Sequence, residues 1–281
     1  MLKFKEHLRT DRLPHIWCPG CGDGTVAKII IQAIQSLGYE KDKVMVATGI
    51  GCSSRINNIM DYNTFQATHG RTVAFASGFK VTRPDMTVLA VTGDGDGAGI
   101  GGNHLINAAR RNIDMTVILV NNYIFGMTGG QFSPLTPYGA NASTAVYGCV
   151  EYPFDVCKLM EAAGATYVGR GTVYHYALTE KLITKAIEHK GFSYVEVISQ
   201  CPTTFGKRNK DTGGSNAYKQ LMWQKEHAVL ATEVDKFDDE YMKDKFLIGE
   251  LLVRTDRMEY TQADQELKEK VMALAKDGEV S

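Results

Sequence analysis

The chain has 281 residues, and its 31 Lys and Arg against 32 Asp and Glu give a formal net charge of −1. This near balance provides no long-range attraction to nucleic acid or to anionic membranes. Apolar runs such as Met115–Val120 are far shorter than the roughly 20 residues of a membrane span, and the first residues lack the apolar core of a signal peptide. We therefore expect a soluble, cytoplasmic protein that binds neither nucleic acid nor membrane.

Most of the chain alternates between helical periodicity and short, continuous apolar runs. Apolar residues between Val26 and Leu37 recur at helical spacing, and Gly38 is suited to end that helix. The later pattern predicts strands at Val44–Ile50, Thr87–Gly93, Met115–Val120, Thr166–Val168 and Tyr194–Ser199, and helices at Asn103–Arg111, Phe154–Ala163 and Ala177–His189. Buried strands separated by helices indicate an α/β fold whose mostly parallel sheet is covered by helices on both faces.

The character of the sequence changes after Cys201. Lys207–Gly214 is a polar, loop-like stretch, and the last sixty or so residues are charged and weakly patterned. We therefore divide the chain into a binding domain at residues 1–200 and a C-terminal extension at residues 201–281. The extension is expected to pack as a tail on a partner subunit.

A glycine-rich segment follows the strand predicted at Thr87–Gly93. Its glycines let backbone N–H groups approach a phosphate, and Asp94 comes directly after the strand. Asn122 follows Asp94 by 28 residues, at the end of the next strand, and one βαβ unit of about 30 residues places two such strand ends side by side. A carboxylate and an amide oxygen could then hold Mg²⁺ on a diphosphate. The alternative is a plain glycine-rich turn and an unrelated strand-end turn.

The GDG…NN arrangement resembles the thiamine-diphosphate motif of thiamine-dependent enzymes. The resemblance implies a thiamine-diphosphate-binding fold, with Mg²⁺ held by Asp94, Asn122 and the carbonyl of Ile124. The residues it places around the cofactor are Gly93, Asp94, Gly95, Asp96, Asn122, Ile124, Gly126, Met127 and Thr128.

Four of the six cysteines stand where metal ligands could converge. Cys18 and Cys21 form a C-x-x-C pair, and Cys52 and Cys201 each follow a predicted strand. Four thiolates could hold an iron–sulfur cluster or a zinc ion, and the pair alone could be a redox motif. The remaining two, Cys149 and Cys157, are expected to be buried small apolar residues.

Six segments in this order resemble the β subunit of 2-oxoacid:ferredoxin oxidoreductases: WCPGCGDG, GIGCSSR, HGR, GDGDG…IGGNH, NNYIFGMTGGQFSPLTP and QCPTTFGKRN, covering roughly Trp17–Lys210. The resemblance implies that Cys18, Cys21, Cys52 and Cys201 bind one [4Fe–4S] cluster. It also implies oxidative decarboxylation of a 2-oxoacid with coenzyme A to acyl-CoA and CO₂, with ferredoxin taking the electrons. The Glu that activates thiamine comes in this family from a partner α subunit, so this chain is half an active site. Further small subunits are compatible with this assembly.

Two residues are candidates for contact with the substrate. Arg55 matches a position where the family presents a cation to the substrate carboxylate, although a surface or interface salt bridge would also explain it. His69 resembles a position near cofactor and cluster, where it could relay protons or simply be a core histidine. The family often has Lys where Gly129 stands, so that contact is missing here. The QCPTTFGKRN segment favours 2-oxoglutarate, with pyruvate or a branched-chain 2-oxoacid as alternatives.

Two other classes of protein stay open at this point. One is a non-oxidative thiamine-dependent decarboxylase or synthase subunit whose cysteines bind zinc or no metal. The other is an electron-transfer module that keeps the cluster but no longer binds thiamine diphosphate.

Overall fold

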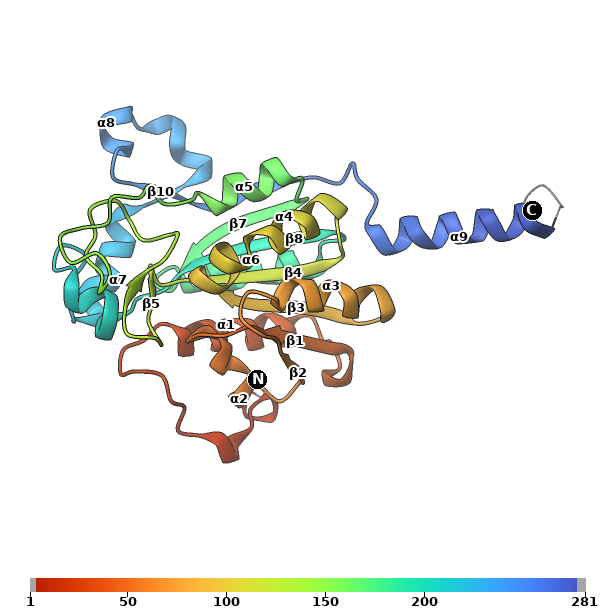
Figure 1. Ribbon diagram of the computed structural model, residues 1–281, viewed down its shortest axis with the longest axis horizontal. Helices are drawn as coiled ribbons and strands as arrows, with labels where there is room; N and C mark the ends of the chain where they lie inside the picture. Colours follow the sequence, from red (N-terminus) through yellow and green to blue (C-terminus); the bar gives the residue numbers. More distant parts are fainter. Residues whose placement is uncertain (1–3, 277–281) are drawn as a thin grey trace.

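The computed structural model describes residues 4–276 and contains an eight-stranded sheet in the order β2-β1-β3-β4-β8-β7-β10-β9 (Figure 1). Neighbouring strands are parallel except for β10, which runs antiparallel to β7. The strands are β1 (Val44–Thr48), β2 (Asn63–Gln66), β3 (Thr87–Gly93), β4 (Met115–Asn121), β7 (Tyr167–Thr172), β8 (Phe192–Ile198), β9 (Ala228–Leu230) and β10 (Phe246–Val253). A two-stranded hairpin of β5 (Ile124–Phe125) and β6 (Gln131–Phe132) follows β4.

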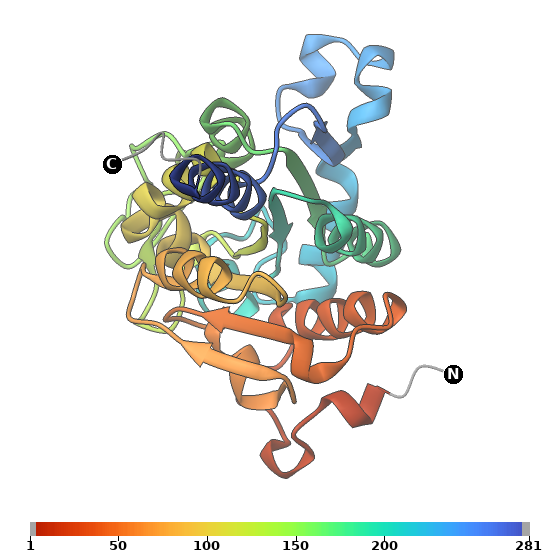
Figure 2. The same cartoon turned by 90° about the vertical axis from the view of Figure 1, so that its right-hand side faces the viewer.

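Helices cover both faces of the sheet, as the apolar pattern predicted (Figure 2). The helices are α1 (Asp23–Ser36), α2 (Ile56–Ile59), α3 (Thr72–Thr82), α4 (Gly102–Arg111), α5 (Val156–Ala163), α6 (Tyr176–Glu188), α7 (Ala217–His227), α8 (Asp239–Met242) and α9 (Tyr260–Lys276). α1 and α6 pack on one face, whereas α3, α4 and α5 pack on the other. Alternate residues of β3 enter the two cores, Val88 and Ala90 one and Leu89 and Val91 the other. This double burial is why the central strands are continuous apolar runs.

Several predicted boundaries differ from the structure, two of them for clear local reasons. The helix expected from Phe154 begins at Val156, because the Asp155 side chain caps it by accepting a hydrogen bond from the backbone N–H of Lys158. The strand expected at Thr166–Val168 extends to Thr172. Its second half contains Gly169, Arg170 and Gly171. These residues break the continuous apolar run by which a buried strand is predicted, and glycine is uncommon in strands.

The C-terminal part contains strands that the sequence pattern did not indicate. β9 and β10 continue the sheet beyond β7, so residue 200 does not separate two sheets. Only part of β10 is buried, because it lies near the edge of the sheet. α9 projects away from the body of the molecule (Figure 1). Within residues 4–276, no helix is both long and apolar enough to cross a membrane.

Candidate active site

The candidate site lies where β3 and β4 end side by side. Gly93 pairs with Val120 in the parallel register, so Asp94 and Asn122, which follow these strands, are brought to the same edge of the sheet. This edge lies toward β5 in Figure 1. Here a cavity is lined by every residue predicted to surround the cofactor, by His69 and Cys52, and by five further residues: Ile50, Gly51, Ser53, Val120 and Phe125. The topology therefore gathers the glycine-rich segment and the Asn-Asn segment into one pocket.

Asp94 is a buried carboxylate without a cationic partner. Its side chain is 3% exposed and accepts a hydrogen bond of 2.5 Å from Ser133 Oγ, but it makes no ion pair within the described part of the chain. Burial raises the pKa of Asp94 to about 7. Asn122 is also buried, and its Oδ1 accepts only the backbone N–H of Ile124, at 3.2 Å. Two hard oxygen ligands, one of them a charge that lacks compensation, fit a divalent cation such as Mg²⁺.

Asp96 differs from Asp94 because protein donors occupy both of its oxygens. Oδ1 accepts the backbone N–H of Gly70 at 2.7 Å and of Ile50 at 3.2 Å, and it lies 2.6 Å from His69 Nδ1. Oδ2 accepts the hydroxyls of Thr92 at 2.6 Å and Thr72 at 3.2 Å. The Asp96 side chain thus ties the loop after β1 and the segment before α3 to the glycine-rich turn, and it orients the His69 ring.

The turn after β4 is anchored by a buried polar network that the sequence analysis did not single out. Asn121 Nδ2 donates to Glu196 Oε1 at 2.7 Å, and Asn121 Oδ1 accepts the backbone N–H of Tyr123 at 3.0 Å. Glu196 also pairs with Arg170 at 2.6 Å, and Arg170 pairs with Asp155 at 2.7 Å. Tyr123 adopts a left-handed φ of 64°, which is uncommon outside glycine. Glu196 stands in the middle of the otherwise apolar strand β8, and a charged residue at such a buried position is the feature of the sequence that could have indicated this network.

The four predicted cluster cysteines lie near one another beside the cavity. Burial is the main cause that raises the pKa of Cys52 to about 12, and the neighbouring Cys18 and Cys201 raise it further. Burial likewise raises the pKa of Cys21, with contributions from Cys52 and Cys201. Across residues 4–276, no three His, Cys, Asp or Glu side chains converge closely enough to hold a single metal ion.

Backbone contacts hold these cysteine segments together. Trp17 Nε1 donates to the carbonyl of Cys52 at 2.8 Å, and the backbone N–H of Gly22 donates to the carbonyl of Gln200 at 3.1 Å. A Cβ placed on Gly126 would lie 3.3 Å from Cys52 Sγ, so Cys52 borders the cofactor cavity directly. Cys149 and Cys157 are buried, as expected; Cys157 lies in the core beside Glu196.

Arg55 and His69 occupy different positions relative to the cavity. His69 lines it, and 40% of its side chain is exposed. Arg55 lies outside it, in the wall of a second cavity, and reaches the first only through a 4.0 Å contact between Nη2 and Met127 Sδ. Arg55 makes no ion pair with the described residues, and its Nε is buried without a partner. A guanidinium in this state has hydrogen-bonding capacity available for an anion.

The parallel sheet and the Asp94–Asn122 pocket define a thiamine-diphosphate-binding protein. In agreement, the profile of the thiamine pyrophosphate enzyme C-terminal TPP binding domain matches residues 49–197. The 2-oxoglutarate synthase subunit KorB of Methanocaldococcus jannaschii is 44% identical, over 95% of this chain and 97% of the relative. The 2-oxoacid:ferredoxin oxidoreductase subunit beta of Saccharolobus solfataricus is 37% identical, over 72% of this chain and 67% of the relative. The chain belongs to this family of 2-oxoacid:ferredoxin oxidoreductase beta subunits.

One solved structure is similar over nearly the whole chain. It is a 2-oxoglutarate:ferredoxin oxidoreductase from Magnetococcus marinus with 2-oxoglutarate, coenzyme A and succinyl-CoA bound. The TM-score is 0.84 at 33% identity, and the match covers 96% of this chain and 91% of that one.

The KorB subunit of Archaeoglobus fulgidus is 51% identical, over 72% of this chain and 75% of the relative.

Proposed function

We propose that this chain is the β half of an enzyme that converts 2-oxoglutarate and coenzyme A to succinyl-CoA and CO₂. In this reaction the bond between the carboxylate and the keto carbon breaks, a thioester forms, one proton is released and two electrons pass singly to ferredoxin. The observation that carries the proposal is that Cys52, which has the other three cysteines as neighbours, lines the Asp94–Asn122 pocket. Carbon–carbon cleavage and electron removal require these two kinds of site side by side.

Thiamine diphosphate would supply both a carbanion equivalent and a sink for electrons. Asp94, Asn122 and the carbonyl of Ile124 would bind Mg²⁺ on its diphosphate, and the glycine-rich turn admits the phosphates close to the backbone. Gly126, Met127 and Thr128 would line the pocket farther out. His69, held by Asp96, is placed to exchange a proton at its other ring nitrogen.

A [4Fe–4S] cluster is our proposed ligand for Cys18, Cys21, Cys52 and Cys201. Cluster ligands bind different iron atoms and therefore stand farther apart than thiolates that share one zinc ion. The thiols of Cys52 and Cys21 each feel the charge of other cysteines of this set, so the four lie in one neighbourhood. The resemblance of the cysteine motifs to the family favours the cluster over zinc. Iron would bind the thiolates and release the protons that the raised pKa values hold.

The proposed substrate follows from the relatives and from Arg55. The KorB relatives are named for 2-oxoglutarate. The free guanidinium of Arg55, next to Met127 at the edge of the pocket, would bind the second carboxylate of that substrate. Pyruvate and branched-chain 2-oxoacids lack this carboxylate and would gain less from Arg55.

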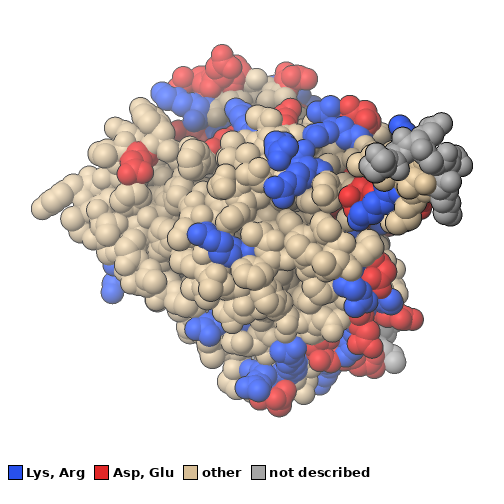
Figure 3. All heavy atoms as spheres, turned by 45° about the vertical axis from the view of Figure 1, so that its right-hand side comes forward, with Lys and Arg blue, Asp and Glu red and all other residues tan. Residues whose placement is uncertain are grey.

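The chain would need a partner α subunit to complete the pocket and to supply the activating Glu. Figure 3 shows a broad surface with few charged side chains, and such surfaces are typical of interfaces. Large apolar side chains are exposed in the segment between β6 and α5: Tyr138, Val146, Tyr147, Val150, Tyr152 and Phe154. We assign residues 1–200 to the cofactor-binding domain and propose that the extension at 201–281 packs on this partner.

The test is to purify the chain anaerobically with its partner and to measure metals, cofactor and turnover. We expect about four irons and four sulfides per β chain, bound thiamine diphosphate, and CoA-dependent reduction of ferredoxin with 2-oxoglutarate in preference to pyruvate. Zinc in place of iron, with turnover that needs no electron acceptor, would instead identify a non-oxidative thiamine enzyme. A cluster without thiamine diphosphate would identify an electron-transfer module.

A further inference from the structure

The hairpin of β5 and β6 forms one wall of the cofactor pocket. Gly126, Met127 and Thr128, which follow β5, line the pocket. The connection to β6 continues through Gly129 and Gly130, whose φ angles of 113° and 97° lie in the left-handed region that favours glycine. The position of this wall therefore depends on what holds the hairpin in place.

Gly130 packs against the segment that follows Cys201, far along the chain. A Cβ placed on Gly130 would lie 2.6 Å from Thr204 Cγ2 and 2.8 Å from Arg208 Nη1. Thr204 belongs to the turn Pro202–Gly206, and hydrogen bonds from Thr204 also reach the Cys201 thiol. The same turn therefore contacts a proposed cluster ligand on one side and the pocket hairpin on the other.

Arg208 joins the turn to the hairpin. Its Nη1 donates to the carbonyl of Thr204 at 3.1 Å, and its Nη2 donates to the carbonyl of Gly129 at 3.4 Å. Arg208 is half-buried, forms no ion pair with another described residue and does not line the cofactor pocket. A guanidinium presents its N–H donors in a fixed fork, so this side chain can hold the two carbonyls at a set separation.

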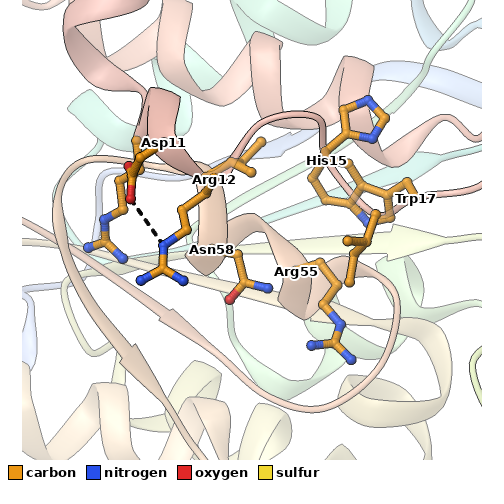
Figure 4. A pocket seen from close by; sticks show the side chains of 9 residues that line it. Asp11, Arg12, His15, Trp17, Arg55 and Asn58 are labelled. Atoms are coloured by element: carbon orange, nitrogen blue, oxygen red, sulfur yellow. Dashed lines mark ion pairs between the residues drawn. The ribbon is translucent and has the colours of Figure 1, made fainter.

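The tip of the hairpin also contacts Arg55, the residue that we propose for the substrate. Met127 Sδ lies 4.0 Å from Nη2 of Arg55. Figure 4 shows Arg55 in the wall of the neighbouring cavity, apart from the ion pair between Asp11 and Arg12. A shift of the hairpin would therefore remove a side-chain contact from a guanidinium that has no carboxylate partner among the described residues.

We propose that Arg208 is a positioning residue, which holds the β5–β6 hairpin on the turn after Cys201 and thereby keeps Met127 against Arg55. The inference rests on the proposed function in one respect, the assignment of Arg55 to the second carboxylate of 2-oxoglutarate. That carboxylate is remote from the carbon that reacts. A contact that is equal in the ground state and the transition state affects KM and not kcat.

The kinetic test uses the assembled enzyme and the substitution Arg208→Gln. We expect the KM for 2-oxoglutarate to rise about tenfold, the loss expected for a hydrogen bond from a charged group. The kcat, and the KM for pyruvate, which lacks the second carboxylate, should stay unchanged. Lys210→Gln, which removes a positive charge from an exposed side chain of the same segment, is the matched control.

A double-variant cycle tests the route from Arg208 to the substrate. If Arg208 acts through Arg55, the substitution Arg208→Gln should cause no further rise in KM in a chain that already carries Arg55→Gln. An equal rise in KM for both 2-oxoacids, or an equal rise in Lys210→Gln, would contradict this route.

Amide hydrogen exchange separates this inference from the proposed function, because it requires no turnover. In the assembled complex, we expect the amides of residues 124–132 to exchange about tenfold faster in Arg208→Gln, while those of β4 exchange as in the wild type. This result supports the positioning role even if no 2-oxoacid is oxidised. Unchanged exchange in the hairpin, or an equal acceleration in β4, overturns the inference even if the enzyme oxidises 2-oxoglutarate normally.

Discussion

Two aspartates only two positions apart, Asp94 and Asp96, serve opposite purposes because their surroundings differ. The two carboxylate oxygens of Asp96 have five hydrogen-bonding partners in the protein, so Asp96 holds together the segments that carry them. Asp94 has one hydroxyl donor and no cation, although it is equally buried. A buried carboxylate is costly without a partner, so this position fits the metal ion that we propose there and does not favour stability of the isolated chain.

Replacing Asp94 should therefore separate stability from cofactor binding. We expect Asp94→Asn to leave the melting temperature of the metal-free chain at pH 8 unchanged or higher, because it removes an uncompensated buried charge. The gain in melting temperature that Mg²⁺ and thiamine diphosphate give the wild type should disappear. Thermal melts with and without both ligands measure this. An undiminished gain in the variant would contradict the assignment of Asp94.

Asn121 should act on the metal through the turn that it holds. We expect Asn121→Ala to weaken Mg²⁺ binding about 10- to 100-fold, as measured by Mg²⁺ titration at fixed thiamine diphosphate, since outer partners of metal ligands have effects of this size. Cys157→Ala is the control, because Cys157 touches the same Glu196 from the core side. If Asn121→Ala lowers the stability of the chain but leaves Mg²⁺ affinity unchanged, the role of the network is purely structural.

Among the elements, the glycine-rich turn after β3 depends on close packing against β5. An added Cβ on Gly95 would lie 2.0 Å from the Phe125 ring, whereas Gly102, at the start of α4, has open space around it. The turn therefore requires glycine at position 95 for a steric reason, and position 102 does not.

This packing predicts that a substitution at Gly95 can be compensated by a second substitution at Phe125. Gly95→Ala should abolish thiamine diphosphate binding because the turn is pushed away from Phe125. The double variant Gly95→Ala/Phe125→Ala should recover part of it, since the clashing ring is gone. Equilibrium dialysis of the cofactor measures both, with Gly102→Ala as the control. Failure of the second substitution to restore any binding would show that the glycine is needed for backbone conformation or for phosphate access.

α9 is the element least bound to the body of the chain. Leu267, Val271 and Met272 are exposed on a helix that projects from the fold (Figure 1). Deleting residues 263–281 should shift the melting temperature of the isolated chain by less than about 2 °C, below the shift expected for 1 kcal/mol. Association with the α subunit should weaken, as measured by analytical ultracentrifugation. Unchanged association would remove α9 from the proposed interface.

The chain as a whole combines a cofactor pocket with a cysteine site assembled from distant segments. The arm before α1, the loop after β1 and the segment after β8 meet beside the pocket only in the folded structure. An iron–sulfur cluster bound to these cysteines would lie beside the proposed thiamine site, where it could accept electrons. The exposed apolar segment between β6 and α5 marks the chain as one part of a larger assembly.

The cysteine assignment can be checked by metal analysis of the anaerobically purified complex. Cys52→Ser should lower iron and acid-labile sulfide by at least about half and bleach the visible absorbance, because a cluster takes four Cys ligands. Cys157→Ser, in the core, should leave both unchanged. Equal iron content in the two variants would exclude Cys52 as a ligand.

The sequence alone was sufficient for the class of fold, the family and the residues around the pocket. These conclusions rest on local patterns: continuous apolar strands, the GDG…NN spacing and the ordered cysteine motifs. Because β3 and β4 are parallel neighbours, the two halves of the GDG…NN motif lie close together at the ends of these strands. The sequence pattern did not indicate β9, at the edge of the sheet, or its neighbour β10, because both strands are only partly buried and have a weak apolar pattern.

Other features depend on contacts between residues far apart in the chain, which no local pattern reports. Asp94 and Asp96 look alike in the sequence, and only their tertiary neighbours show that Asp96 has protein donors on both oxygens whereas Asp94 has a single hydroxyl donor and no cation. Arg55, a candidate for contact with the substrate, lies in the fold between the pocket and a cavity formed with Arg9 and Arg12, a position that its sequence neighbours do not indicate. The charge and hydrogen-bonding state of a side chain is set by what packs around it, and that packing exists only once the chain has folded.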